Sequence, residues 1–268
     1  MQRCHSARAL FWRGVLAAAS DVAMVTGAYP LLPAVALALR HRRRPAMRAA
    51  LVEWGLSLAV SAARPIGFLG LPGRAARGPR PIILVHGYAM NRANFLPLAA
   101  RLARAGLGPI VGFEYWTLGK TASAAKKLAA LVDEVRARTG AATVDIVGHS
   151  MGGVVGRYYV TLGGGDGVVA NLVTLGTPHA GTEASAVGIG RPIRELMGNS
   201  SLLTRLATAK RPEHTRITVI WSRADALVPS AREAHLVGTD ELILDDVGHL
   251  GLLASRRVAT AIIERLKT

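Results

Sequence analysis

From about residue 81 to the end of the chain, short apolar runs alternate with longer amphipathic stretches. The runs have the length and composition of buried strands, and they lie at 82–85, 109–113, 143–147, 171–175, 216–221 and 241–246. The stretches between them have helical spacing of apolar residues, and they lie at 92–106, 121–140, 152–160 and 250–267. Strands that alternate with helices predict an α/β fold, with a mostly parallel sheet flanked by helices on both faces.

The N-terminal part has a different pattern. Residues 14–39 are apolar apart from Asp21, and this stretch exceeds the roughly 20 residues that a membrane-spanning helix needs. A second apolar stretch, 49–71, is interrupted by Glu53 and Arg64. Two interpretations stay open: a pair of helices packed on the rest of the protein, or a segment that spans or lies on a membrane. We expect association with a bacterial inner membrane, without fixing the side, and a soluble cytoplasmic protein is the alternative.

These patterns divide the chain into three parts. Residues 1–72 form an apolar, basic and helical N-terminal segment, 73–80 a linker rich in Gly, Pro and Arg, and 81–268 the α/β domain. Residues 182–214 are too long for a simple connection between two strands, and their apolar spacing predicts one or two amphipathic helices. Those helices are either a fixed surface pair or a lid that opens over a site.

The formal net charge of +16 raises the question of a nucleic-acid partner. Residues 1–80 hold 12 of the 33 Lys and Arg but only 2 of the 17 Asp and Glu. The basic excess is therefore concentrated outside the α/β domain, and no nucleic-acid-reading motif accompanies it. We expect no nucleic-acid partner. Cys4 is the single cysteine, so the chain can form neither an internal disulfide nor a thiolate metal cluster.

The segment "VDIVGHSMGGVV", 144–155, places one serine between glycines directly after a predicted buried strand. Gly148, His149, Ser150, Met151 and Gly152 match the G-x-S-x-G pattern of a nucleophile elbow, a sharp strand-to-helix turn that exposes a serine hydroxyl. Glycine is needed at 148 and 152 because side chains there would collide with neighbouring backbone. The pattern and its position between strand and helix predict that Ser150 is a nucleophile.

A serine nucleophile needs a base, and the base needs an acid that orients it. On an elbow of this kind the chain order is serine, acid, histidine. Asp225 and His249 each follow a predicted strand and satisfy that order. Asp245 and Asp246 are rivals for the acid because they lie closer to His249 in sequence. The alternative for Asp225 is an ordinary turn aspartate.

Two backbone N–H groups are expected to stabilise the anionic oxygen of a tetrahedral intermediate. One belongs to Met151, the residue after the nucleophile. The other is expected in the loop after the first strand of the domain, where His86 and Gly87 form a tight turn and Tyr88 is placed to offer its N–H.

At this point the chain from about residue 80 resembles the α/β-hydrolases, within them the bacterial lipases and esterases. The resemblance rests on five segments in order, "VHGYAMNRANF", "VDIVGHSMGGVVGRYY", "VTLGTPHAGT", "SRADALVP" and "VGHLGLL". It implies a triad of Ser150, Asp225 and His249, with oxyanion donors at Tyr88 and Met151. It also implies that Thr177 and His179 shape the acyl pocket and the base of the lid. We could assign no acid pair for a calcium site, so no metal and no cofactor are expected.

The expected activity is hydrolysis of lipophilic carboxylic esters through an acyl-serine intermediate. Acyl transfer to another alcohol and thioester hydrolysis use the same triad and stay open. A catalytically silent, membrane-bound binding protein with a hydrolase fold is the alternative from a different class. The oligomeric state is not predicted.

Overall fold

The computed structural model describes residues 51–56, 58–60, 71, 78–182 and 191–267 of the chain. A six-stranded sheet lies at its centre, in the strand order β2-β1-β3-β4-β5-β6, and every neighbouring pair is parallel. The strands are β1 (Ile82–Val85), β2 (Ile110–Phe113), β3 (Val144–His149), β4 (Val169–Leu175), β5 (Arg216–Ser222) and β6 (Asp240–Leu244). All six overlap the apolar runs from which strands were predicted, so the predicted fold class is confirmed.

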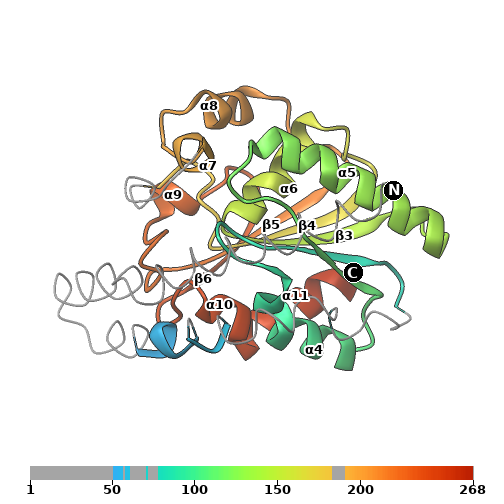
Figure 1. Cartoon of the computed structure of the whole chain (residues 1–268), viewed down its shortest axis with the longest axis horizontal. Coiled ribbons are helices and arrows are strands. Elements are labelled where there is room, and N and C mark those ends of the chain that lie inside the picture. The colour runs from blue at the N-terminus through green and yellow to red at the C-terminus, as the bar shows by residue number, and fades with distance from the viewer. Residues whose placement is uncertain (1–50, 57, 61–70, 72–77, 183–190, 268) are drawn as a thin grey trace, which may run out of the picture.

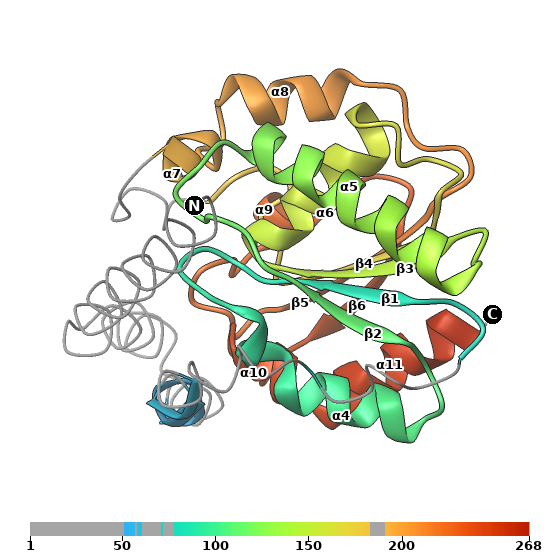
Figure 2. The same ribbon diagram turned by 45° about the vertical axis from the view of Figure 1, so that its right-hand side comes forward.

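Helices cover both faces of the sheet (Figures 1 and 2). One face carries α5 (Thr121–Thr139) and α6 (Met151–Leu162), and the other carries α4 (Leu96–Arg104), α10 (Gly251–Ala254) and α11 (Arg256–Lys267). Two separate apolar clusters fill the space between sheet and helices, one around Val132, Val154 and Leu172 and one around Leu98, Val173 and Ile262. Because both faces are buried, β1 is apolar throughout and every residue of β3 is buried, so buried and exposed positions do not alternate in these two strands.

The order in which the chain adds strands to the sheet reverses at β1. The chain passes from β1 to β2 on one side and then crosses to β3 on the other side of β1. In open α/β sheets a crevice forms outside the carboxyl ends of the strands at such a reversal, and ligands bind there. The loops that meet at this point follow Val85 and His149, and they contain the Gly87 turn and Ser150.

Two helices were predicted with the wrong internal structure. The stretch 92–106 begins with a 3-10 turn, η2 (Arg92–Phe95), before α4 starts. The stretch 250–267 is not one helix, because Ser255 adopts an extended conformation with ψ 130° and separates α10 from α11. A short helix, α9 (Ala231–Ala234), was not predicted.

Residues 182–214, called the cap from here on, contain two helices, α7 (Arg191–Glu195) and α8 (Ser201–Thr208). Residues 183–190 lie outside the described part. Leu202, Leu203 and Leu206 of α8 are buried in the cluster that also contains the apolar side of α6. The cap therefore packs on the α5–α6 side of the molecule.

Most of the N-terminal segment lies outside the described residues, including the first apolar stretch and most of the linker. Residues 51–56 and 58–60 of the second stretch are helical. Among the residues that the structure does describe, no helix has both the length and the apolar character needed to cross a bilayer. The domain boundaries at 72 and 81 stay predictions.

Candidate active site

Ser150 occupies the sharp turn between β3 and α6. Its backbone has φ 54° and ψ −126°, a conformation that non-glycine residues rarely adopt and that costs about 1–3 kcal/mol. The Ser150 N–H donates to the carbonyl of Leu175 at 2.8 Å, which fastens the turn to the end of β4. A strained serine held in this way between a strand and a helix has the geometry of a nucleophile elbow.

The two elbow glycines are required by close backbone approaches. A Cβ atom at Gly152 would lie 2.1 Å from the carbonyl oxygen of Val85, and one at Gly148 would lie 2.6 Å from the Cα atom of Gly153. Neither obstacle is a flexible side chain. The start of α6 therefore packs directly against the end of β1, which brings the elbow next to the loop that follows Val85.

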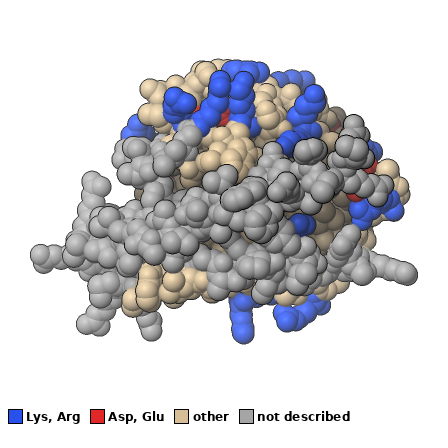
Figure 3. All heavy atoms as spheres, in the orientation of Figure 1, with Lys and Arg blue, Asp and Glu red and all other residues tan. Residues whose placement is uncertain are grey.

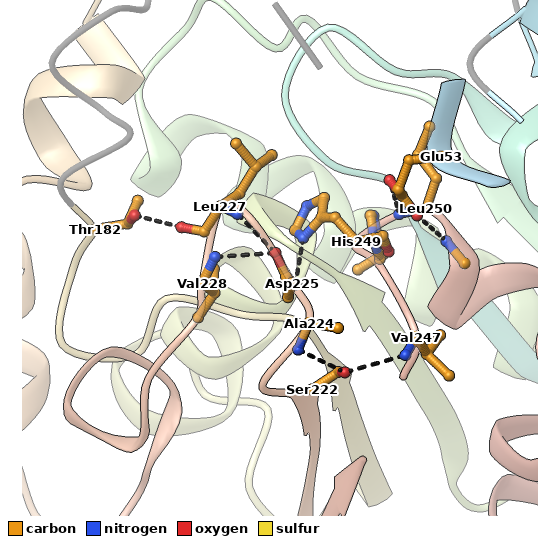
Figure 4. Close-up of polar contacts among 12 residues, drawn as sticks. Glu53, Thr182, Ser222, Ala224, Asp225, Leu227, Val228, Val247, His249 and Leu250 are labelled. Atoms are coloured by element: carbon orange, nitrogen blue, oxygen red, sulfur yellow. Dashed lines mark hydrogen bonds and ion pairs between the residues drawn. The ribbon is translucent and has the colours of Figure 1, made fainter. Parts of the chain in front are cut away.

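Asp225 and His249 form a buried pair (Figure 4). The Nδ1 atom of His249 lies 2.7 Å from Oδ2 of Asp225, and both residues are buried, Asp225 completely. They come from the loops after β5 and β6, as the sequence predicted. Because a carboxylate only accepts, Nδ1 carries the proton and Nε2 is left as the basic nitrogen.

The loop around Asp225 fixes the direction of its carboxylate. Oδ1 accepts the backbone N–H groups of Leu227 at 2.8 Å and Val228 at 2.9 Å, so that Oδ2 remains for the histidine. The hydroxyl of Ser222 accepts the N–H of Ala224 at 3.2 Å and that of Val247 at 3.4 Å, and so joins the two loops. Figure 4 shows the first two contacts meeting at Asp225 and the two contacts of Ser222 below them.

The surroundings of His249 favour its protonated form. Burial alone would lower the pKa of His249, but the charge and hydrogen bond of Asp225, together with the charge of Glu53, raise its pKa above the ordinary value. An imidazole with a raised pKa is a stronger base. Such a base is suited to take a proton from a hydroxyl and to return that proton later.

His149, the residue before Ser150, supports His249 from the other side. Its Nε2–H donates to the backbone carbonyl of His249 at 3.0 Å, and the two ring centroids are 4.5 Å apart. Burial, followed by the nearby charge of His249, lowers the pKa of His149 well below its ordinary value, so it stays neutral. His149 thus contacts His249 through both a hydrogen bond and ring packing.

Gly176 connects the pair to the elbow. It follows Leu175, whose carbonyl binds Ser150, and a Cβ atom there would lie 2.8 Å from Oδ2 of Asp225 and 3.1 Å from Nδ1 of His249. Its φ of 52° also favours glycine. The three predicted triad residues thus share one end of the sheet, and their catalytic roles stay predictions.

The loop after β1 lies against Ser150. A Cβ atom at Gly87 would lie 2.9 Å from the Cβ atom of Ser150. His86 is fully buried, with Nε2 3.1 Å from Oε1 of Glu114, and its carbonyl accepts the Tyr115 hydroxyl at 2.7 Å. These contacts fix the loop that carries Tyr88.

Met151 is the first residue of α6. The N–H groups in the first turn of a helix have no partner within that helix. Donation from the N–H groups of Met151 and Tyr88 to an oxyanion stays a prediction.

The rival acids lie elsewhere. Asp245 and Asp246 have exposed side chains, and they form ion pairs with Arg223 and Arg257 respectively. Asp145 is buried, but it binds Arg80 and Asn171 near the start of β3. The geometry favours Asp225 as the partner of His249.

Comparison with known protein families places these residues in context. Residues 68–228 match the model of a family described as a domain of unknown function, DUF7379. The chain belongs to the DUF7379 family. The matched part contains Ser150 and Asp225, while His249 follows it and Glu53 precedes it.

Curated relatives of this DUF7379 protein include two proteins named triacylglycerol lipase, from Pseudarthrobacter phenanthrenivorans and Burkholderia plantarii. Each is 34% identical over 113 residues, which is 38% of this chain. The chain spans only 34% and 30% of the length of these two relatives.

Solved structures similar to the DUF7379 protein include lipases. The mature lipase BlEst2 of Bacillus licheniformis aligns with a TM-score of 0.64 at 16% identity, covering 70% of this chain and 92% of that one. The monoacylglycerol lipase of Paleococcus ferrophilus aligns with a TM-score of 0.54 at 17% identity, covering 74% of this chain and 95% of that one. The fold is therefore that of the α/β-hydrolases.

The segment "GTPHAGT" of the DUF7379 protein directly follows β4. His179 is buried, with Nε2 3.0 Å from the Thr174 hydroxyl, and burial followed by the charge of Arg157 lowers the pKa of His179 to about 3. Thr177 is fully buried, and its hydroxyl has no hydrogen-bond partner among the described residues. A neutral His179 is thus bonded to β4, and its role in shaping an acyl pocket and the base of a lid stays a prediction.

No group of three His, Cys, Asp or Glu side chains suited to a metal ion occurs in the described part of the chain. Asp240, near His249 in sequence, forms an ion pair with Arg265 at 2.8 Å. Asp240, Asp245 and Asp246, the aspartates that shortly precede His249, thus each pair with an arginine.

Glu53 is a site residue that the sequence did not identify. Its carboxylate accepts the backbone N–H groups of Leu250 at 2.9 Å and Gly251 at 2.6 Å, directly after His249 (Figure 4). The sequence contains one indication of its role, because Glu53 is an acid in an otherwise apolar stretch. It was interpreted only as an interruption of that stretch.

Proposed function

We propose that the protein is a serine hydrolase that cleaves carboxylic esters with lipid-like acyl groups. The observation that carries this proposal is the buried Asp225–His249 pair at the same end of the sheet as Ser150, whose φ is 54°. A serine on a strained turn, at the same end of a sheet as a histidine oriented by an acid, is the arrangement that activates a hydroxyl for attack on a carbonyl.

In the first half of the reaction, Nε2 of His249 takes the hydroxyl proton of Ser150 as its Oγ attacks the ester carbonyl carbon. The carbonyl oxygen becomes an anion, which accepts hydrogen bonds from the N–H groups of Met151 and Tyr88. The bond to the alcohol oxygen then breaks. His249 gives its proton to the departing alcohol, and the acyl group stays on Ser150.

In the second half, His249 takes a proton from water while the water oxygen attacks the acyl carbon. The tetrahedral intermediate is again stabilised by the two N–H groups. It releases the carboxylic acid, and Nε2 returns the proton to Oγ of Ser150. Asp225 keeps the imidazole oriented and stabilises its positive charge without taking up a proton.

Two observations support a lipophilic substrate. Relatives that share 34% identity over 113 residues are named triacylglycerol lipases. Large apolar side chains are also exposed near the cap: Trp116 and Leu118 follow β2 at its carboxyl end, and Met197 follows α7. Exposed apolar groups near a site favour apolar ligands.

Polar contacts and the buried leucines of α8 join the described part of the cap to the body of the protein, and a lid would have to release some of them. Oε2 of Glu195 in α7 accepts the N–H of Thr121, the first residue of α5, at 2.8 Å. Arg157 of α6 donates to the carbonyls of His179 at 2.9 Å and Leu206 at 3.0 Å. A fixed surface pair of helices is the alternative, and activity across the solubility limit of a substrate separates the two.

Association with a membrane surface through residues 1–72 belongs to the same proposal. Leu51, Val52 and Trp54 are exposed in the described part of that segment. Figure 3 shows Lys and Arg over the part of the molecule where Figure 1 places α8 and α5, and the exposed basic residues there include Arg194, Arg205 and Lys126. Each Lys or Arg near an anionic membrane contributes about 1 kcal/mol. Full-length protein is expected to pellet with membranes at physiological salt, and complete recovery in the supernatant would contradict this part.

A fluorophosphonate probe and an ester series test the proposal. The probe is expected to label the full-length protein, and nitrophenyl esters of increasing acyl length are expected to be hydrolysed with a preference above acetate. Faster turnover of thioesters than of esters would indicate a thioesterase. Faster turnover of esters when an alcohol is added would indicate acyl transfer to that alcohol. Absence of both labelling and hydrolysis would favour the silent binding protein.

A further inference from the structure

Glu53 is an acid buried in an otherwise apolar segment. It is 8% exposed, whereas its neighbours Val52 and Trp54 are 54% and 46% exposed. Burying a carboxylate is costly unless hydrogen bonds compensate for lost water. Burial of the Glu53 carboxylate therefore needs compensating contacts, and the groups that it contacts indicate its role.

Those groups are backbone atoms next to His249. Oε2 of Glu53 lies 2.9 Å from the N–H of Leu250, and Oε1 lies 2.6 Å from the N–H of Gly251. On the other side of the histidine, the three atoms nearest to a Cβ built at Gly248 all belong to Glu53, at 2.4 to 2.6 Å. Glycine at 248 is therefore what lets the carboxylate approach. Glu53 contacts residues on both sides of His249.

The local sequence has no side chain that could replace Glu53. The first free N–H groups of a helix are normally bound by a Ser, Thr, Asp or Asn at the N-cap. Here the N-cap residue, Leu250, makes no side-chain cap bond, position 249 is the histidine committed to Asp225, and position 248 is glycine. The hydrogen bonds must come from another part of the chain, and Glu53 supplies them from 197 and 198 positions away.

The histidine is thereby held from three directions. Asp225 binds its ring, His149 donates to its backbone carbonyl, and Glu53 binds the two N–H groups that follow. Because the imidazole is carried by this backbone, a shift of Leu250 or Gly251 moves Nε2 relative to Ser150. Misplacement of a reacting group by 1 Å can cost about 100-fold in rate.

The electrostatics agree with this geometry. Burial raises the pKa of Glu53, and the two backbone hydrogen bonds and the charge of His249 oppose that rise. Conversely the carboxylate of Glu53 adds to that of Asp225 in raising the pKa of His249. The titratable groups that face the imidazole are thus Asp225, Glu53 and the neutral His149.

We propose that Glu53 is a positioning residue for the general base: it fixes the backbone of His249 and stabilises the imidazolium that forms during acyl transfer. This inference rests on the proposed function of the Ser150–His249–Asp225 site. It makes the N-terminal segment part of the catalytic machinery, although Glu53 lies outside the part that matches the family model.

The test compares Glu53→Ala and Glu53→Gln in the full-length protein with Glu134→Gln, which removes the same charge from an exposed side chain on α5. Thermal unfolding establishes which variants fold. With a soluble nitrophenyl ester, Glu53→Ala is expected to lower kcat by roughly 10- to 100-fold while KM stays within about twofold. Glu53→Gln keeps one acceptor oxygen and is expected to lose less.

A further readout separates positioning from a merely structural role. Removal of the Glu53 charge is expected to lower the pKa of His249, measured by NMR titration of its ring. That titration needs no turnover, so it tests the inference even if ester hydrolysis were absent and the proposed function failed. If Glu53→Gln leaves both kcat and the His249 titration unchanged, the inference about Glu53 is overturned, whereas the proposed function of the site is not.

Gly248→Ala provides an independent variant. The added Cβ displaces Glu53, so it is expected to lower kcat in the wild-type background and to cost several-fold less when combined with Glu53→Ala, which removes the atoms that the Cβ would meet. Coupling of this kind is expected only for residues that act through one contact. Equal costs in both backgrounds would show that Gly248 and Glu53 act separately and would contradict the proposal.

Discussion

The carboxylate of Asp225 binds the ring of His249 at 2.7 Å, with its second oxygen held by the N–H groups of Leu227 and Val228. Replacing Asp225 with Asn keeps the shape but offers an N–H where the ring needs an acceptor, which disturbs the histidine tautomer. We expect kcat to fall by about 10⁴, the effect of the same change in a serine protease triad. Steady-state hydrolysis of a nitrophenyl ester measures it.

Asp245→Asn is the matched control for that change. The Asp245 side chain is 73% exposed and pairs with Arg223 on the surface. Surface ion pairs contribute little, so this variant is expected to keep nearly full activity. A silent Asp225→Asn with a crippled Asp245→Asn would require a different acid.

The pH dependence of kcat/KM reports the state of His249. Burial lowers the pKa of His249, but Asp225 and Glu53 together raise it above its ordinary value. The ring accepts a proton from Ser150 only when it is neutral, so activity is lost as the pH falls through this raised pKa. We therefore expect the acidic limb of the profile to have its midpoint above about 6.5. A midpoint well below that value would show that burial outweighs the two carboxylates.

Gly152→Ala tests the packing of the elbow. The added Cβ would lie 2.1 Å from the carbonyl oxygen of Val85 and 2.5 Å from that of His86. Since both obstacles are backbone atoms, the elbow or β1 must move, and we expect a loss of about 1–3 kcal/mol in unfolding free energy together with most of the activity. Urea unfolding and ester hydrolysis measure the two effects.

Gly55→Ala is the corresponding control, because Gly55 is helical and a Cβ there meets no atom within 4 Å. Alanine is the better helix former, so this variant is expected to be neutral or slightly stabilised. Equal losses for both variants would mean that the close approach at Gly152 is not what requires glycine.

A mobile cap predicts that activity rises when substrate passes from monomers to droplets. Leu202 and Leu203, the natural choice for a lid variant from sequence alone, are buried against the core, so their substitution would disturb folding. Met197, which is 43% exposed after α7, is the better position. Met197→Ser is expected to blunt the rise on an emulsified triacylglycerol more than it slows a soluble ester.

Leu162→Ser provides the control, since Leu162 is exposed at the far end of α6 from Ser150. A rate curve that stays hyperbolic across the solubility limit would indicate a fixed cap and an ordinary esterase.

The parts of this molecule that sequence reasoning predicted are those that local pattern and sheet geometry determine. Apolar runs identified all six strands, and a parallel sheet places the residues after each strand at one edge. That is why Ser150, Asp225 and His249 could be assigned to one end of the sheet across about a hundred residues.

The parts that it missed depend on contacts between distant segments. The apolar positions Leu252, Leu253, Val258, Ala259 and Ile262 keep helical spacing across the break at Ser255, so periodicity gave no sign of two helices. Glu53 meets Leu250 from 197 positions away, and nothing in its own neighbourhood indicates that partner. The role of Arg157 in joining the "GTPHAGT" loop to α8 likewise appears only in three dimensions.

The central claim is that Ser150 is the nucleophile, and the most direct measurement is the turnover of a nitrophenyl ester by purified Ser150→Ala protein beside the wild type. The side chain lies at a strained turn and its removal leaves the backbone contact to Leu175 in place, so the variant is expected to fold normally. We predict loss of more than nine-tenths of the turnover, and of all fluorophosphonate labelling. A folded Ser150→Ala protein that keeps more than about a tenth of wild-type turnover would contradict the account, because removing a triad nucleophile costs several orders of magnitude.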